Sequence, residues 1–144
     1  MKPDSHPYRL LDHTADLKVE IYGQGLKELF CNAAFMVFDV MLDLKEVREQ
    51  GQYEISLQST DLPELFLDWL RELLFLFSTR SFVTRRVEIS ALQSEPAQLK
   101  AVVYGESYDP DRHGLKIEIK TPTYHQYQIE QMQEGYRATV IFDV

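Results

Sequence analysis

Two segments of the chain repeat apolar residues with the period of an amphipathic helix. In residues 26–41 and again in 62–77, apolar side chains recur at i, i+3, i+4 and i+7, the pattern of a helix with one buried face. The second segment also has a start signal, because Asp61 can cap it and Glu64 follows three residues later. Gly25, which offers no side-chain oxygen, is the expected cap of the first segment. We therefore expect two helices, each with one face in the core.

Most of the remaining chain alternates between apolar and polar residues, as half-buried strands do. Leu17, Val19 and Ile21 give the clearest example, within residues 17–22. The other predicted strands are 53–57, 82–89, 98–104, 116–121, 124–130 and 136–142. Turn residues separate strands at 94–96, 109–111 and 134–135, and the charged stretch 43–51 is predicted to be a solvated loop. This order favours an α+β fold, with two helices packed on one face of a mostly antiparallel or mixed sheet.

Composition narrows the class of protein. The 144 residues are 44% hydrophobic and 26% charged, as in an ordinary globular protein, and predict a single domain over 1–144. The formal net charge of −8 disfavours direct nucleic-acid binding, which normally needs a basic surface. The single cysteine, Cys31, excludes an internal disulfide and fits a reducing compartment. Because no signal peptide or long apolar stretch is present, we expect a soluble cytoplasmic protein without membrane association.

Standard catalytic and cofactor motifs are absent from the sequence. It has no phosphate-binding loop, no G-x-G-x-x-G, no C-x-x-C and no H-E-x-x-H, which disfavours the common nucleotide and zinc sites. Cys31 lies beside the apolar face of the first predicted helix and is expected to be an unreactive, buried thiol. His113 and His125 do not have the spacing of a metal triad or a Ser-His-Asp arrangement, so we expect packing or surface roles for them.

Carboxylates stand at both ends of the predicted fold. The run Asp12-His13-Thr14-Ala15-Asp16 precedes the first predicted strand. Asp143 and Val144 follow the alternating apolar residues of the last predicted strand. Each group has two interpretations. The first run is either a turn bonded to its own backbone or part of an oxygen-rich cation site that needs a second segment. Asp143 is either a strand end in water or a residue that is tied down. Lys120, in an alternating segment, is by itself a solvent-facing position.

Taken together, these regions resemble the archease family. The matching stretches are His13-Thr14-Ala15-Asp16 with Tyr22-Gly23, residues 26–34, residues 68–74, Tyr104-Gly105-Glu106 with Asp109 and His113, residues 118–125, and residues 140–144. They follow in order over essentially the whole chain. The resemblance implies a small cytoplasmic protein that is not itself an enzyme and has no catalytic residues. It implies a protein cofactor that activates a GTP- and manganese-dependent RNA ligase of tRNA splicing and RNA repair, by promoting ligase guanylylation and multiple turnover.

The resemblance also implies a site. A divalent metal, calcium in the family and with magnesium or manganese as alternatives, is expected at Asp16, Asp143 and the main-chain oxygen of Val144, with His13 and Asp12 nearby. Lys120 matches the family's functional lysine. The expected protein partner is the tRNA-splicing type of RNA ligase, through which RNA and GTP would be reached.

Pro122 departs from the family pattern, and two alternative hypotheses for the function stay open. Pro122 removes a backbone donor, so the strand after Lys120 should be an edge strand or carry a bulge. Asp16, Asp143 and His13 could instead serve a metal-dependent phosphoesterase or other hydrolase. A third hypothesis is that the protein is a chaperone-like interaction module, which predicts an exposed apolar patch.

Overall fold

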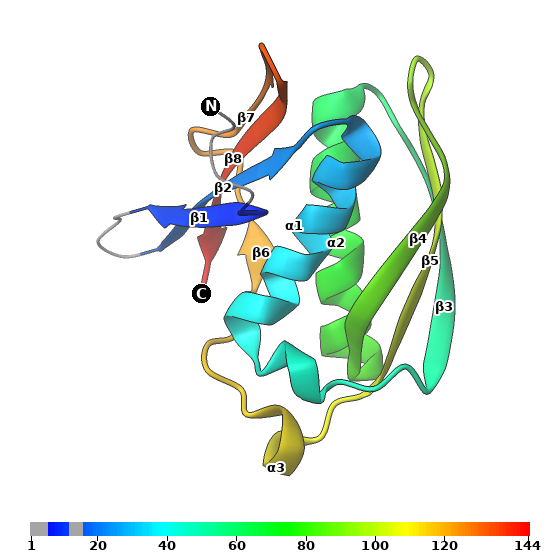
Figure 1. Ribbon diagram of the computed structural model, residues 1–144, viewed down its shortest axis with the longest axis vertical. Helices are drawn as coiled ribbons and strands as arrows, with labels where there is room; N and C mark the ends of the chain where they lie inside the picture. Colours follow the sequence, from blue (N-terminus) through cyan, green and yellow to red (C-terminus); the bar gives the residue numbers. More distant parts are fainter. Residues whose placement is uncertain (1–5, 12–15) are drawn as a thin grey trace.

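The computed structural model describes residues 6–11 and 16–144, and in this part of the chain the strands form two sheets with helices between them (Figure 1). Helices α1 (Leu26–Met41) and α2 (Leu62–Arg80) make up the middle layer. The predicted α+β class is confirmed. The single sheet with both helices on one face is replaced by a sheet on each side, because α2 buries residues such as Leu67 and Leu76 beyond its predicted apolar stripe.

The larger sheet has the last strand at its centre. Its order is β1 (Tyr8–Leu11), β2 (Leu17–Gly23), β8 (Gly135–Asp143) and β6 (Thr121–Pro122), and β7 (Gln128–Met132) also pairs with β8. Every pairing given for these strands is antiparallel. In Figure 1 the first strands and β8, far apart in sequence, therefore lie side by side.

The second sheet consists of β3 (Gly51–Ser59), β5 (Ala97–Ser107) and β4 (Phe82–Ser94), in that order and antiparallel. It contacts both long helices. The helices are joined at Phe30, whose ring meets Phe66 edge to face at 5.0 Å between centroids and whose carbonyl accepts a 2.8 Å hydrogen bond from the Trp69 indole. All three side chains are fully buried, which places the centre of the core between the two helices.

The helix starts agree with their sequence signals. The Asp61 carboxylate accepts a 2.9 Å hydrogen bond from the Glu64 N–H, as an N-cap does. Gly25 begins α1 without a side-chain hydrogen bond, also as predicted.

Several strand predictions differ from the structure in their bounds. The predicted strand 116–121 is wrong except at Thr121, because the Lys116 N–H donates to the Met41 carbonyl at the end of α1 at 2.6 Å instead of joining a ladder. The predicted strand 124–130 begins only at Gln128, after a turn in which the Tyr127 N–H donates to Tyr124 at 3.2 Å. The two-residue β6 lies at the edge of the sheet, as Pro122 predicted.

Two segments predicted as loop or turn contain short helices. The stretch 43–51 contains the 3₁₀ helix η1 (Leu44–Glu46), and it is not a solvated loop because Leu44 and Val47 are buried. The turn at 109–111 is the start of α3 (Pro110–His113), capped by the Asp109 carboxylate. Strand β1 has no counterpart in the sequence prediction. Within the described residues, no helix is long and apolar enough to cross a bilayer.

Candidate functional site

The last residues of β8 bring three distant segments to one end of the larger sheet. Leu17 of β2 and Pro122 of β6 both pair with Phe142, one on each side, and Thr121 pairs with Asp143. Asp16 immediately precedes Leu17, and Lys120 immediately precedes Thr121. Opposite residues in antiparallel strands lie roughly 5 Å apart. Asp16, Asp143 and Lys120 therefore lie close to one another at this end of the sheet. We call Asp16, Lys120, Asp143 and Val144 the β8 tip.

The β8 tip is built on an apolar strand. Ala138, Val140 and Phe142 are fully buried, whereas Asp143 is exposed at the end of the same strand. The Lys120 N–H donates a 2.9 Å hydrogen bond to the Asp143 carbonyl, and β2 pairs with the other side of β8 up to Phe142. Of the two interpretations of Asp143, the structure therefore supports a residue that is tied down.

The donor chemistry of the β8 tip fits a hard divalent cation. Asp16 is half-buried and Asp143 is exposed, and both supply carboxylate oxygens, to which the Val144 main-chain oxygen can be added. Among residues 6–11 and 16–144, no group of three His, Cys, Asp or Glu side chains is placed to hold a metal ion. Asp16 and Asp143 are the side-chain ligands that the described residues of the β8 tip offer a cation. The predicted neighbours Asp12 and His13 lie outside the described residues.

Lys120 presents an uncommitted ammonium group. Its side chain is exposed, and in the described part of the chain its Nζ has no hydrogen-bond or ion-pair partner. It lines an open hollow beside α2 together with Thr121. Such a group is free to meet a phosphate or carboxylate of another molecule as a compact point charge.

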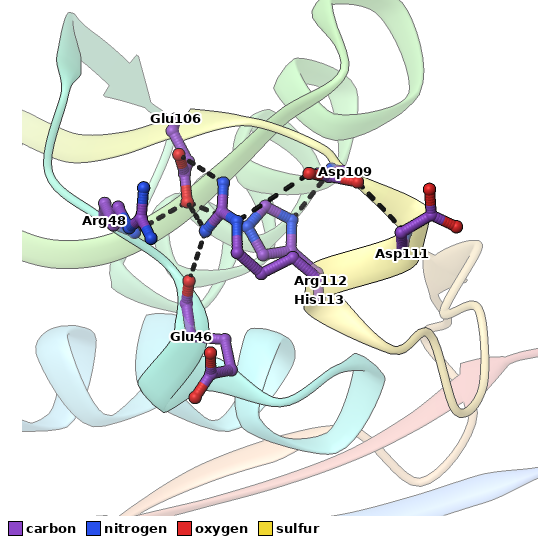
Figure 2. A network of polar contacts seen from close by, with 7 residues as sticks. All are labelled: Glu46, Arg48, Glu106, Asp109, Asp111, Arg112 and His113. Carbon is purple, nitrogen blue, oxygen red and sulfur yellow. Dashed lines mark hydrogen bonds and ion pairs between the residues drawn. The ribbon is translucent and has the colours of Figure 1, made fainter.

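Residues of the motif Tyr104-Gly105-Glu106 with Asp109 and His113 form an ion cluster around the buried Glu106 carboxylate, separate from the β8 tip (Figure 2). Glu106 lies near the end of β5 and is 6% exposed. Its carboxylate accepts hydrogen bonds from both terminal nitrogens of Arg112, at 2.7 and 2.9 Å. It also accepts the Arg48 N–H at 2.8 Å and lies 2.8 Å from Nε2 of His113. The family motif contains Glu106, Asp109 and His113, but neither Arg112 nor the Arg48 N–H belongs to it, and nothing in the sequence pattern indicated the cluster.

His113 is a packing residue, as predicted, and its hydrogen bonds define its tautomer. The ring is fully buried, and its Nδ1 accepts a 2.9 Å hydrogen bond from the Asp109 N–H. A neutral imidazole that accepts at Nδ1 carries its proton at Nε2, which therefore donates to Glu106. Both ring nitrogens are committed, so His113 is not a metal ligand in this arrangement.

The cluster makes the stability of the protein depend on pH. The Arg112 guanidinium, helped by the Arg48 N–H and His113, lowers the pKa of Glu106 to about 2 against the opposing effect of burial. A lowered folded-state pKa stabilises the protein above the ordinary carboxyl value of 4.5, and this contribution is lost as the pH falls from there toward about 2. We expect the difference in unfolding free energy between the wild type and Glu106→Gln to shrink over this range. Urea denaturation at stepped pH measures it, and a constant difference would contradict the assignment.

Cys31 has the environment of an unreactive thiol. It is half-buried on α1. Burial, and after it the Glu28 carboxylate, raises the pKa of the Cys31 thiol above its usual value. Because the thiolate is the nucleophilic form, this agrees with the unreactive thiol predicted for Cys31, although the side chain is half-buried and not buried as expected.

Fold and site together define a small α+β protein whose candidate residues gather at one exposed end of a sheet. The sequence model of the Archease protein family (MTH1598/TM1083) matches residues 8–144. Curated relatives named "Protein archease" include one from Methanosarcina acetivorans, 38% identical over 100% of both chains. Another, from Archaeoglobus fulgidus, is 31% identical over 95% of this chain and 98% of its own. The chain belongs to the archease family.

Solved structures show the same fold. The solution structure of Methanobacterium thermoautotrophicum protein 1598 is similar with a TM-score of 0.81 and 29% identity, over 96% of this chain and 99% of the other. A crystal structure from Thermotoga maritima, described as an archease and possible chaperone, gives a TM-score of 0.63 at 21% identity, over 93% and 94% of the two chains. This second likeness is one of fold alone.

Proposed function

We propose that this protein is a non-catalytic, cytoplasmic cofactor of an RNA ligase of the tRNA-splicing type. It promotes guanylylation of the GTP- and manganese-dependent ligase and thereby allows multiple turnover in tRNA splicing or RNA repair. The observation that carries the proposal is the β8 tip, where the strand register brings Asp16, Lys120 and Asp143 together from three segments. Membership of the archease family supports it, since these are the positions that the family resemblance assigns.

A divalent cation completes the proposed site. Asp16, Asp143 and the Val144 main-chain oxygen would hold it, and calcium is the first candidate, with magnesium and manganese as alternatives. Bound there, it would supply positive charge that offsets the repulsion between the two carboxylates and attracts anionic oxygens of the ligase site. Lys120, directly before the neighbouring strand β6, adds a second positive charge.

Charge complementarity favours the proposed partner. The protein carries a formal net charge of −8, whereas a protein that binds RNA presents a basic surface. Opposite charges steer such partners together and fix their relative orientation more than they increase affinity. RNA and GTP are then handled by the ligase, and the β8 tip acts at the edge of the ligase active site.

The proposal is tested by transfer of labelled GTP to the cognate ligase. Purified ligase is mixed with GTP labelled at the α-phosphate and manganese, with or without the protein, and label bound covalently to the ligase is followed over time. We expect the protein to raise the initial rate at least tenfold, and Lys120→Ala to remove most of this increase. Lys45→Ala, at an exposed lysine of η1, is the matched control. Equal rates with and without the wild-type protein would refute the proposal.

The cation is tested separately by calorimetric titration. We expect calcium to bind the metal-free wild type at one site, and Asp143→Asn to weaken this binding at least tenfold because a charged ligand becomes neutral. Asp111→Asn, at an exposed carboxylate on α3, should bind as the wild type does. The idea fails if Asp143→Asn binds calcium like the wild type.

The two other functions make different predictions for the same preparation. A phosphoesterase would turn over a generic phosphoester and lose this activity in Asp16→Ala. A chaperone, the role suggested for the Thermotoga maritima protein, would suppress aggregation of unfolded proteins, with Asp16→Ala fully active. Either result, in the absence of ligase activation, would replace the proposed function.

A further inference from the structure

The helix layer carries a hollow on the side of α2. Strands β3 and β6 both contact α2, and among the described residues each is an edge strand of its own sheet. Between them lies an open hollow of about 460 Å³. Its wall consists of Leu57 on β3, of Asp68, Arg71, Glu72, Leu74, Phe75 and Ser78 on α2, and of Lys120 with Thr121. We call this surface the α2 groove.

The chemistry of the α2 groove is that of a small protein interface. Phe75 is 52% exposed on a stripe of α2 whose neighbours three and four residues away, Arg71, Glu72 and Ser78, are polar. Asp68 is neutralised, because it accepts hydrogen bonds from Ser59 at 2.6 Å and from Arg71 at 2.9 Å.

Two charged groups of the α2 groove remain uncommitted. Glu72 and Lys120 have no hydrogen-bond or ion-pair partner in the part of the chain that the structure describes. The exposed Phe75 ring thus lies near unpaired charges of both signs. Protein interfaces commonly have this arrangement, in which an apolar contact is surrounded by polar groups.

We propose that the α2 groove is the surface on which the RNA ligase docks. A ligase segment places an apolar side chain on Phe75 and a basic side chain against Glu72, and this interaction rests on the function proposed above. Lys120 belongs both to the groove and to the β8 tip, so the two surfaces are continuous. A ligase whose active site meets the β8 tip therefore lies over the α2 groove as well.

Charge distinguishes the ligase from other occupants. An RNA backbone would approach a protein of net charge −8, which has its own sign, and would face the unpaired Glu72 carboxylate in the groove. A second copy of this chain would bring a protein of the same −8 charge against the groove. A basic, RNA-binding protein gains from the same carboxylate and is the occupant that the groove favours.

Affinity and activation titrations test the docking surface. Binding of the cognate ligase is measured by biolayer interferometry, and the rate of multiple-turnover ligation is measured against the concentration of this protein. For Phe75→Ser and for Glu72→Lys we expect the dissociation constant and the half-maximal concentration to rise at least tenfold, with maximal activation recovered at saturation. Lys120→Ala should instead lower maximal activation. Met132→Ser, at a residue 40% exposed near the start of β8 and far from the β8 tip, is the control and should stay within twofold of the wild type.

The outcomes separate the docking surface from the function. If the wild type activates the ligase but both groove variants bind it normally, the α2 groove is not the docking surface and the proposed function stands. If Phe75→Ser instead weakens RNA binding by the protein alone, or dissolves a dimer seen by sedimentation, another occupant replaces the ligase. If the wild type neither binds nor activates its ligase, the proposed function fails and the docking surface with it.

Discussion

Asp143→Ala is expected to reduce multiple-turnover ligation by the cognate ligase to the rate seen without this protein, a loss of at least tenfold. The carboxylate stands at the end of β8, beside Asp16 of the neighbouring segment and the Lys120 backbone. Its removal leaves one side-chain carboxylate at the β8 tip, too few oxygens to retain a cation that takes six or more. The ligation rate at saturating variant is the measurement.

The loss in Asp143→Ala should be functional and not structural. Asp143 is exposed, and its backbone hydrogen bond with Lys120 does not depend on its side chain, so the unfolding free energy should stay within about 0.5 kcal/mol of the wild type. Asp16→Ala should behave in the same way, and Asp111→Ala should activate normally. Full activation by both Asp16→Ala and Asp143→Ala would show that the carboxylates of the β8 tip are not needed for activation.

Glu106→Ala is expected to have the largest effect on stability, a loss of about 3 kcal/mol, because it leaves the Arg112 guanidinium and the buried His113 without their acceptor. The Arg48 N–H also loses its acceptor. Since Arg112 additionally donates to the Glu46 carbonyl at 2.6 Å, the cluster ties α3 to η1, and both segments should loosen. Urea denaturation at neutral pH measures the loss.

Two further variants test whether the loss of stability is specific to the charged Glu106 side chain. Glu106→Gln keeps the volume and one acceptor oxygen but not the charge, so its loss should be intermediate. Glu118→Ala, at an exposed carboxylate in the same part of the chain, should change stability by less than about 0.5 kcal/mol. An unfolding free energy of Glu106→Ala equal to that of Glu118→Ala would contradict a stabilising cluster.

The helices could be predicted closely because their signals are local. The apolar period and the Asp61 cap lie within the segments they describe, and α1 and α2 begin where these signals begin. Strand β4 was predicted to end at Ile89 but continues to Ser94, and the reason is visible in its register. Shifts between Thr84 and Arg86 and between Ile89 and Ala91 interrupt the two-residue alternation on which the prediction relied.

The division into two sheets could not be predicted, because strand pairing is a property of distant segments. Residues 17–23 pair with 136–142, and no pattern within either segment specifies the other. The same holds for the site. The family resemblance could assign Asp16 and Asp143 to one site and match Lys120 to a functional lysine, but the physical basis of their common location is the registers of β2 and β6 against Phe142. The burial of Glu106 could not be predicted for a related reason, since it depends on Arg112 and His113, which pack against its carboxylate from another segment.

The β8 tip is the part of the molecule through which we propose that this protein turns a single-turnover RNA ligase into a multiple-turnover one. The most direct measurement is a ligation time course with a catalytic amount of the cognate ligase, excess RNA bearing cyclic-phosphate and 5′-hydroxyl ends, GTP and manganese. With the wild-type protein we expect product well beyond one equivalent of ligase, and with Asp143→Ala we expect a plateau near one equivalent. Product that stops at one equivalent with the wild-type protein as well would contradict the proposal.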